Sequence, residues 1–184
     1  MSALARPQII AHRVEPESRS WTSWVTTTDH KKIGIMYLVT VLVFFVLGEI
    51  EALLIRTQLA IPDNTLLTPE RYNQIFTMHG TTMIFLVIVP VCAGFANYLL
   101  PLMIGARDVA FPRLNAWSYW MYLFGGLALY GSMFFSPPEA GWFSYVPLSL
   151  KQYSATNGQE AWIYMVHLTG LSSILGAINF VATI

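Results

Sequence analysis

Two histidines lie in apolar segments of this chain, a few residues from the start of each segment: His79 and His167. A polar residue inside a membrane span is costly and is therefore a functional hypothesis by default. A neutral imidazole nitrogen is a good ligand for haem iron. Gly80 follows His79 and leaves room for a bulky group beside the helix. Two interpretations stay open: one haem held between His79 and His167, or imidazoles that only pair helices through a neighbouring Ser or Thr.

Charged residues accompany His79 on the same side of the membrane. Arg56 closes the first apolar segment, and Glu49 and Glu51 lie about a turn deeper. Arg56 can donate hydrogen bonds to a haem substituent, or it can extend to the lipid headgroups as many such arginines do. Unpaired carboxylates in hydrocarbon are costly, so we expect the two glutamates to face the protein interior, to be protonated or to lie near the interface.

A second polar cluster lies toward the opposite side of the membrane. Asp108 follows the second apolar segment, ~43 Å from His79 if the stretch between them is helical. Amides that donate and accept hydrogen bonds can hold a file of water molecules below a carboxylate. The alternative is that one amide caps a helix and the others pair helices. The amides placed in this half of the bilayer are Asn97, Asn115 and Asn179.

Four apolar segments must position these groups, and each is long enough to cross ~30 Å of hydrocarbon as a helix. Pro90 and Pro101 in the second segment predict a kink and a helix end, and neighbouring helices must bond the backbone groups that they free. Thr68 can cap a short helix ahead of that segment. The predicted spans are 33–54, 75–104, 116–135 and 161–184.

The distribution of basic residues predicts the orientation of the chain. Cytoplasmic flanks of membrane spans carry an excess of Lys and Arg. Seven such residues flank one side and three the other, which predicts a cytoplasmic N-terminal segment, 1–32, ahead of a transmembrane domain, 33–184. The first group is Arg6, Arg13, Arg19, Lys31, Lys32, Arg107 and Arg113; the second is Arg56, Arg71 and Lys151.

Composition agrees with an all-α, polytopic transmembrane helix bundle. Of the 184 residues, 55% are hydrophobic and only 11% are charged, where soluble domains carry about a quarter. A net charge of zero gives no basis for nucleic-acid binding, and the single cysteine, Cys92, cannot form an internal disulfide. The last apolar segment reaches Ile184 without a flanking loop, so we expect a fragment of a longer protein.

Several strings, in this order and spacing, resemble subunit I of the haem–copper respiratory oxidases, especially the bacterial cytochrome c oxidases. The resemblance covers about Thr27 to Ile184 and is looser near 136–160. The strings are TTDHKKIG (27–34), LLIRTQL (53–59), YNQIFTMHGTTMIF (72–85), GARDVAFPRLN (105–115) and HLTGLSSILGAINF (167–180).

This resemblance implies specific roles for the polar residues. His79 matches the axial ligand of the low-spin haem iron, and Arg56 matches the arginine that hydrogen-bonds the formyl group of that haem. Asp108 matches the mouth of the proton-uptake path on the cytoplasmic side, with Asn97, Asn115 and Asn179 matching the asparagines that constrict its water chain. The counterpart of His167 in the family is not a ligand, which argues against a haem shared by His79 and His167.

The resemblance also implies what this chain lacks. It supplies four of about twelve spans; the second low-spin ligand, the high-spin haem, the copper ion and the catalytic residues belong to later spans. The low-spin haem is expected to be of the A type. Expected partners are subunits II and III, cytochrome c as electron donor and oxygen, in a bacterial plasma membrane. The implied activity is oxygen reduction to water coupled to proton pumping, which this fragment alone cannot perform. A quinol oxidase subunit I and a b-type haem anchor without oxidase activity are the alternatives.

One departure from the family pattern concerns a cation site. Mitochondrial relatives carry a glutamate two residues after the arginine, as part of an outer-side cation site. That position is Gln58 here, so the resemblance does not predict this cation site.

Overall fold

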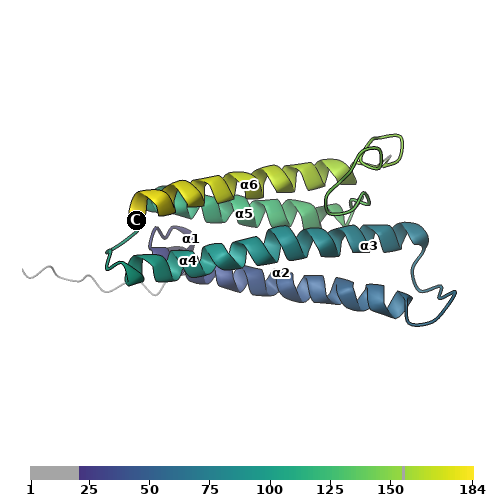
Figure 1. The fold of residues 1–184 in the computed structure, drawn as a ribbon, viewed down its shortest axis with the longest axis horizontal. Coiled ribbons are helices and arrows are strands. Elements are labelled where there is room, and N and C mark those ends of the chain that lie inside the picture. Colours follow the sequence, from purple (N-terminus) through teal and green to yellow (C-terminus); the bar gives the residue numbers. More distant parts are fainter. Residues whose placement is uncertain (1–20, 155) are drawn as a thin grey trace, which may run out of the picture.

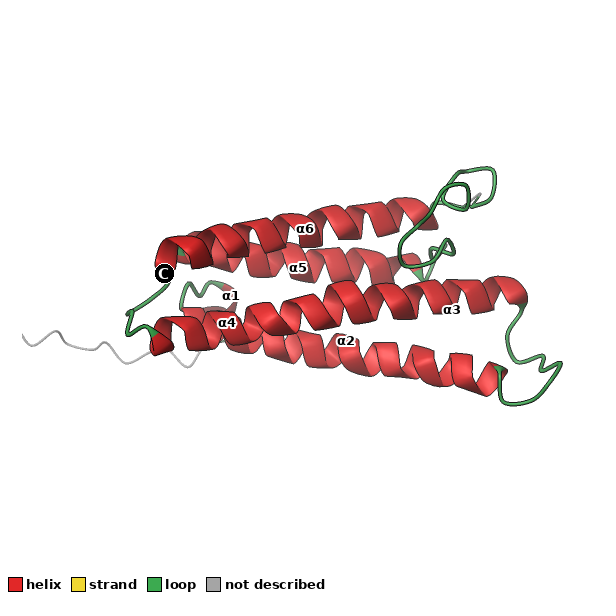
Figure 2. Cartoon of the chain, in the orientation of Figure 1, coloured by secondary structure: helices red, strands yellow, loops and turns green. Residues whose placement is uncertain are grey.

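The computed structural model describes residues 21–154 and 156–184, and this part of the chain is helical without a strand (Figures 1 and 2). The all-α prediction is therefore confirmed. Most of the predicted cytoplasmic segment, 1–32, lies outside the described residues. The helices are α1 (Thr22–Val25), α2 (His30–Gln58), α3 (Pro69–Thr81), the π-helix η1 (Thr82–Ile88), α4 (Val89–Met103), α5 (Pro112–Ser132) and α6 (Gly158–Thr183).

The chain folds as a bundle in which α3, η1 and α4 form one continuous rod (Figure 1). The rod packs along α2, and α5 packs along α6. We call the end of the bundle with residues 56–71, 133–154 and 156–157 the Arg56 end, and the end with residues 26–31, 104–112 and 180–184 the Asp108 end. Each long helix runs between these two ends, so successive helices alternate in direction.

Within the described residues, three helices are long and apolar enough to cross a membrane: α2, the Pro69–Met103 rod and α6. They correspond to three of the four predicted spans, and the chain is an integral membrane protein. The remaining predicted span, 116–135, forms helix α5, which is long enough but less apolar. Its buried face carries polar side chains that lower its hydropathy, among them Asn115, Ser118 and Ser132. A fourth span therefore stays a prediction.

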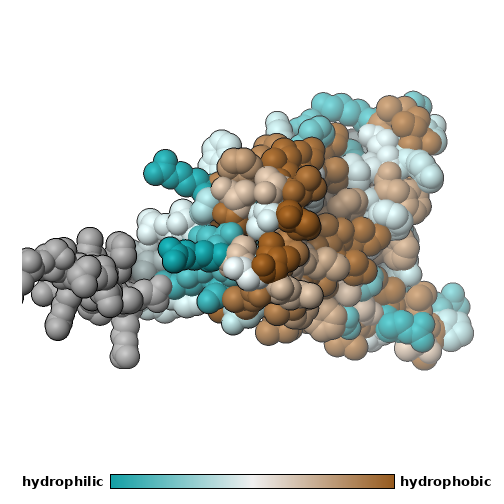
Figure 3. Space-filling model, turned by 60° about the vertical axis from the view of Figure 1, so that its left-hand side comes forward, coloured by the Kyte–Doolittle hydropathy of each residue, from teal (hydrophilic) through white to brown (hydrophobic). Residues whose placement is uncertain are grey.

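On the face that Figure 3 shows, hydrophobic side chains form a broad band across the middle of the bundle, and hydrophilic side chains gather toward the ends. Aromatic side chains are exposed at both ends, for example Trp21 at the Asp108 end and Phe134 and Phe135 at the Arg56 end. Aromatic belts of this kind are typical of membrane–water interfaces.

Local capping fixes where two helices begin. The Asp29 carboxylate accepts a hydrogen bond from the Lys31 backbone N–H (2.7 Å) at the start of α2. Thr68 accepts one from the Arg71 N–H (3.3 Å), with Pro69 in the first turn. Thr68 thus caps a helix as predicted, but that helix continues without interruption into the second span.

The two prolines inside the rod, Pro90 and Pro101, free backbone carbonyls that neighbouring helices bond. In an α-helix, the N–H of residue 90 would donate to the Leu86 carbonyl, but proline has no N–H. The Tyr122 hydroxyl donates to that carbonyl instead (2.8 Å). Likewise, the His30 ring donates from Nδ1 to the carbonyl of Asn97, four residues before Pro101 (2.9 Å). The predicted replacement of these bonds is confirmed.

The prolines also coincide with changes in the helical geometry of the rod. The π-helical turn η1 lies immediately before Pro90, and the rod ends at Met103, two residues after Pro101. π-helical turns are rare and often lie at functional sites. Here the turn separates α3, which carries His79, from α4, which leads to Asp108.

Small residues bring the helices close in the core. Buried residues recur along α2 every three or four positions and face both the rod and α5. At Gly126 of α5, an added Cβ would lie 2.4 Å from the Phe44 ring, so only glycine fits beneath this ring. Phe44 stacks on Tyr130 (5.5 Å between ring centroids), and Tyr37 stacks on Tyr122 (5.2 Å). Close approach through glycine is typical of helix packing in membranes.

Candidate functional site

The His79 imidazole is held by a hydrogen bond that leaves one ring nitrogen open. His79 lies on α3, is half-buried, and places Nδ1 2.9 Å from the Gly48 carbonyl oxygen of α2. Because a carbonyl only accepts, Nδ1 carries a proton, and in the neutral imidazole Nε2 then keeps its lone pair. Metal-bound histidines commonly donate their second ring nitrogen to a backbone carbonyl in this way. The side chain therefore fits an axial ligand of haem iron through Nε2.

Glycine at position 48 allows this contact. A Cβ there would lie 2.9 Å from the Met83 sulfur and 3.4 Å from the Thr82 methyl carbon, so α2 and the rod approach closely at this level. Gly80, by contrast, does not face an open space for a cofactor. A Cβ at Gly80 would meet the Trp142 side chain at 3.1 Å, so the bulky group beside this glycine is an indole of the same chain.

Arg56 lies at the end of α2, two turns past Gly48 and ~12 Å along the helix. Its side chain is exposed, and no hydrogen bond or ion pair holds it within the described residues. Its guanidinium is therefore available to a group outside this part of the chain, and the haem-formyl role stays a prediction.

His167 does not share a site with His79. It is exposed on α6, where Nδ1 donates to the Ile163 carbonyl of the same helix (2.8 Å). α6 packs mainly against α5, whereas His79 is bonded to α2. Two axial ligands must approach one iron from opposite faces, and these contacts do not bring the two imidazoles together. Within the described residues there is also no group of three or more His, Cys, Asp or Glu side chains that could hold a metal ion.

Gln58, which stands where mitochondrial relatives carry a glutamate, has a structural role. The Gln58 side chain accepts from the Leu67 N–H (2.7 Å) and donates to the Asn64 carbonyl (2.6 Å). Asn64 in turn donates to the Thr57 carbonyl (2.8 Å). The amide of Gln58 therefore holds the loop at the Arg56 end without a carboxylate.

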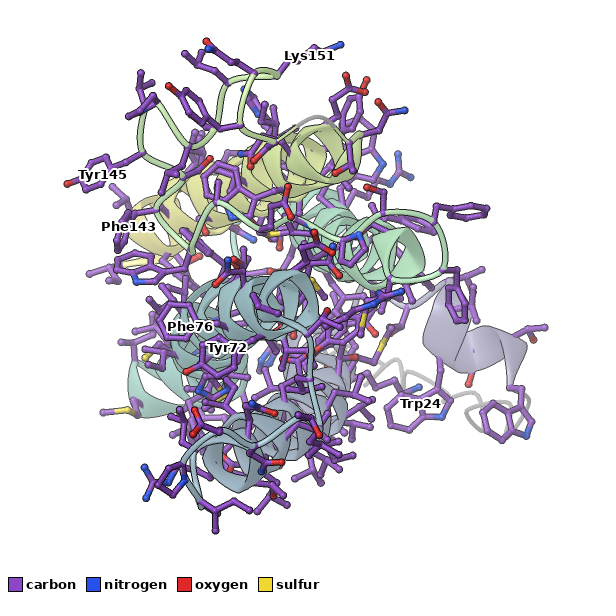
Figure 4. All side chains as sticks on the ribbon, turned by 90° about the vertical axis from the view of Figure 1, so that its right-hand side faces the viewer. Trp24, Tyr72, Phe76, Phe143, Tyr145 and Lys151 are labelled. Carbon is purple, nitrogen blue, oxygen red and sulfur yellow. The ribbon has the colours of Figure 1, made fainter. Side chains whose placement is uncertain are left out.

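Next to this loop, aromatic side chains of α3 and of loop 133–157 project from the same edge of the bundle, namely Tyr72, Phe76, Phe143 and Tyr145 (Figure 4).

At the Asp108 end, the three asparagines are fully buried but differ in their partners. Neither amide atom of Asn115 has a hydrogen-bond partner, and Oδ1 of Asn97 has none. Asn179 is satisfied: it accepts from the Phe111 N–H (2.9 Å) and donates to the Phe111 carbonyl (3.3 Å). Buried polar atoms without protein partners usually bind water. Asn97 and Asn115 thus have atoms free for water, whereas Asn179 fastens a loop.

Helix capping does not account for Asn115. Helix α5 begins after Phe111, and no side chain caps it there. Asn115 lies a full turn inside the helix and points its unpaired amide into the bundle.

A network of hydroxyl groups continues from the asparagines toward the middle of the bundle. The Tyr37 hydroxyl lies 3.0 Å from the Ser118 hydroxyl and 3.1 Å from that of Ser172. Ser118 also donates to the Asn115 carbonyl (2.9 Å). Tyr37, Asn97, Ser118 and Ser172 line a cavity of about 460 Å³ bordered by α2, α4, α5 and α6.

Sequence reasoning missed this network, although a signal was present. Ser118 follows Asn115 by three residues, and Ser172 precedes Asn179 by seven. Both spacings place a serine on the same helical face as an asparagine.

Asp108 lies in the loop between α4 and α5. It is half-buried, and its carboxylate accepts from the Val109 N–H (2.7 Å). The Ala110 N–H donates to the Thr183 hydroxyl (3.0 Å), next to the contact between Phe111 and Asn179. The end of α6 therefore holds the loop that carries this carboxylate.

The family model described as "Cytochrome C and Quinol oxidase polypeptide I" matches residues 32–184. The chain belongs to this family. Haem and copper are the cofactors that the family implies. Cytochrome c oxidase subunit 1 of Synechocystis is 55% identical over 167 residues, which are 90% of this chain and 30% of the relative. That of Thermostichus vulcanus is 49% identical over 171 residues, 92% of this chain and 31% of the relative.

A third relative, a putative cytochrome c oxidase subunit 1-beta of Streptomyces avermitilis, is 46% identical over 184 residues, 99% of this chain and 32% of the relative. The chain thus spans about a third of the length of these curated relatives. The family resemblance seen in the sequence is confirmed, and the roles of individual residues stay predictions.

Proposed function

We propose that this chain is the N-terminal third of the catalytic subunit of a terminal respiratory oxidase, in which it supplies one ligand of a low-spin haem and the first part of a proton path. The observation that carries the haem assignment is the hydrogen bond from His79 Nδ1 to the Gly48 carbonyl, because it leaves Nε2 free to bind iron. Family membership supplies the redox chemistry of the whole subunit.

When bound, the haem supplies a one-electron redox centre. His79 would fix its position relative to α2 and α3, and the hydrogen bond that Nδ1 donates to the Gly48 carbonyl makes the imidazole a more basic ligand. Arg56 would donate hydrogen bonds to a substituent of the haem and so tune its potential. The haem is of the A type.

Protons enter at Asp108 and pass water held by Asn97 and Asn115 before they reach the hydroxyl network of Tyr37, Ser118 and Ser172. Support for this path comes from the unpaired amide atoms and from the cavity that the network lines. Asn179 acts by holding the loop next to Asp108. The Asp108 end faces the cytoplasm of a bacterium, in agreement with its excess of basic residues.

The complete subunit also holds a high-spin haem and a copper ion, reduces oxygen to water and pumps protons. It works with subunits II and III and takes electrons from cytochrome c. The name of its relatives, cytochrome c oxidase subunit 1, supports this choice of electron donor.

The proposal is tested on the full-length subunit, purified in its complex. Oxygen uptake should be rapid with reduced cytochrome c and absent with a quinol. Rapid oxygen uptake with a quinol but not with cytochrome c would show that the electron donor is a quinol. No oxygen uptake with either donor would refute the oxidase assignment. Asp108→Asn tests the path: we expect slower proton uptake with normal haem spectra, and unchanged proton pumping would exclude Asp108 from it.

A further inference from the structure

Glu51 is a buried acid that the proposed function does not use. It lies on α2 with 4% of its surface exposed, and neither carboxyl oxygen has a hydrogen-bond partner. Glu49, two residues earlier on the same helix, is exposed. An isolated ionised carboxylate in such a place is costly, so a proton or a polar contact must compensate for its burial. Of the two glutamates Glu49 and Glu51, only Glu51 therefore faces the protein interior.

The neighbours of Glu51 suit both of its protonation states. The Tyr130 hydroxyl of α5 lies near the carboxyl without a hydrogen bond to it, and it lies 2.9 Å from the hydroxyl of Thr82. Either hydroxyl of this pair can be the donor. If Thr82 donates to Tyr130, then Tyr130 can donate to a carboxylate; if the order reverses, Tyr130 can accept from a carboxylic acid.

Glu51 also lies close to the proposed haem ligand. It is one helical turn past Gly48, whose carbonyl accepts the His79 hydrogen bond. Among the described residues, the titratable group that interacts with Glu51 is Tyr130 of α5. The π-helix η1 contributes Thr82 and Met83 at the level of Gly48, and α4 meets α2 near Gly34, toward the other end. Charges separated by protein rather than water interact strongly. A change of charge on iron bound to His79 will therefore act on the carboxyl.

The packing directs proton exchange toward the Arg56 end. From Glu51 toward the Asp108 end, the same face of α2 carries Phe44, which packs on Gly126 and stacks against Tyr130. This apolar layer separates the carboxyl from the hydroxyl network of Tyr37, Ser118 and Ser172. Toward the Arg56 end, this face of α2 ends at the half-buried Gln58, ~10 Å along the helix from Glu51.

We propose that Glu51 is a redox-linked proton site on the Arg56 side of the haem, an inference that rests on the proposed haem ligation by His79. When the iron gains one electron from its donor, the Glu51 carboxylate takes one proton from water at the Arg56 end. When the electron leaves, the O–H bond of the carboxylic acid breaks and the proton returns to that water.

The test is the reduced-minus-oxidised infrared difference spectrum of the full-length oxidase, poised electrochemically. The wild type should show a carboxylic-acid C=O band that shifts in D₂O. Glu51→Gln should lose this band, and the midpoint potential of the low-spin haem should depend less on pH. The matched control, Glu49→Gln, should keep both features. Tyr130→Phe should shift the band without removing it.

Other outcomes separate this inference from the proposed function. A band that persists in Glu51→Gln, or its absence from the wild type, refutes the proton site while leaving haem ligation intact. If the Glu51→Gln variant does not assemble, the Glu51→Asp variant is measured in its place. A carboxylic-acid band at the wild-type frequency in Glu51→Asp would also refute the proton site. If replacement of His79 leaves the low-spin spectrum unchanged, the proposed ligation itself fails.

Discussion

The two ends of the bundle hold their polar groups in opposite ways. Near the Arg56 end, the His79 ring is fixed by one directed bond to the Gly48 carbonyl. Near the Asp108 end, Asn115 and Asn97 keep amide atoms without any protein partner. A ligand must be fixed in orientation before its metal binds, whereas a water path needs polar atoms that the protein has not used. The state of each hydrogen bond therefore distinguishes a ligand site from a proton path more clearly than the residue types do.

The largest effect is expected where the directed bond holds a ligand. His79→Ala in the full-length oxidase should abolish the low-spin haem spectrum, because no other described imidazole takes its place. His167→Ala is the control and should leave the spectrum unchanged, since His167 is exposed and bonded to its own helix. Optical spectra of the purified enzymes measure both. A normal low-spin spectrum in His79→Ala would contradict the assignment.

At the other end, removal of an unused amide should slow proton movement without disturbing the haem. Asn115→Leu removes a water partner, and an energy of about 1.4 kcal/mol added to the barrier lowers the rate about tenfold. Proton uptake by the enzyme in vesicles measures the rate. A rate equal to that of the wild type would remove Asn115 from the path. The haem spectrum reports whether the variant is folded.

The packing that separates the two ends can be tested by adding one methyl group. Gly126→Ala places a Cβ 2.4 Å from the Phe44 ring, and such overpacking should cost about 1–3 kcal/mol of stability. Gly131→Ala on the same helix is the control, since nothing lies within 4 Å of the added carbon. Thermal unfolding in detergent compares them. Equal stability of the two variants would show that Phe44 moves aside at little cost.

The smallest effect concerns the bond that replaces the missing proline donor. Tyr122→Phe removes the hydroxyl that donates to the Leu86 carbonyl and should lower stability by about 1 kcal/mol. Activity should change little, because Tyr122 does not belong to the hydroxyl network. The same unfolding assay measures the loss, and a stability equal to that of the wild type would mean that η1 satisfies this carbonyl by itself.

The sequence predicted the helices well because long apolar runs leave few alternatives in a membrane. It predicted the end of α2 only to within a few residues, since polar Thr57 and Gln58 continue that helix into the interfacial region. α5 was predicted as a fourth span from its length, but polar side chains on its buried face make it less apolar than the other three helices. The replacement of proline bonds was foreseen in principle, but the donors Tyr122 and His30 depend on tertiary contacts.

The candidate site was foreseen unevenly. His79 was singled out because an imidazole is unusual in an apolar segment, yet its Gly48 partner lies on another helix and cannot be read from local sequence. Gly80 was expected to leave room for a bulky group beside the helix, and that group is the Trp142 indole, which reaches it from a distant loop and could not be named from local sequence. The three asparagines had looked alike, and only their partners separate Asn179 from Asn97 and Asn115.

The most direct test is an experimental structure of the full-length subunit in its complex. We expect Nε2 of His79 to bind the iron of one haem while Nδ1 keeps its hydrogen bond to the Gly48 carbonyl. An iron held by other residues, with the His79 ring free or turned away from Gly48, would contradict the account.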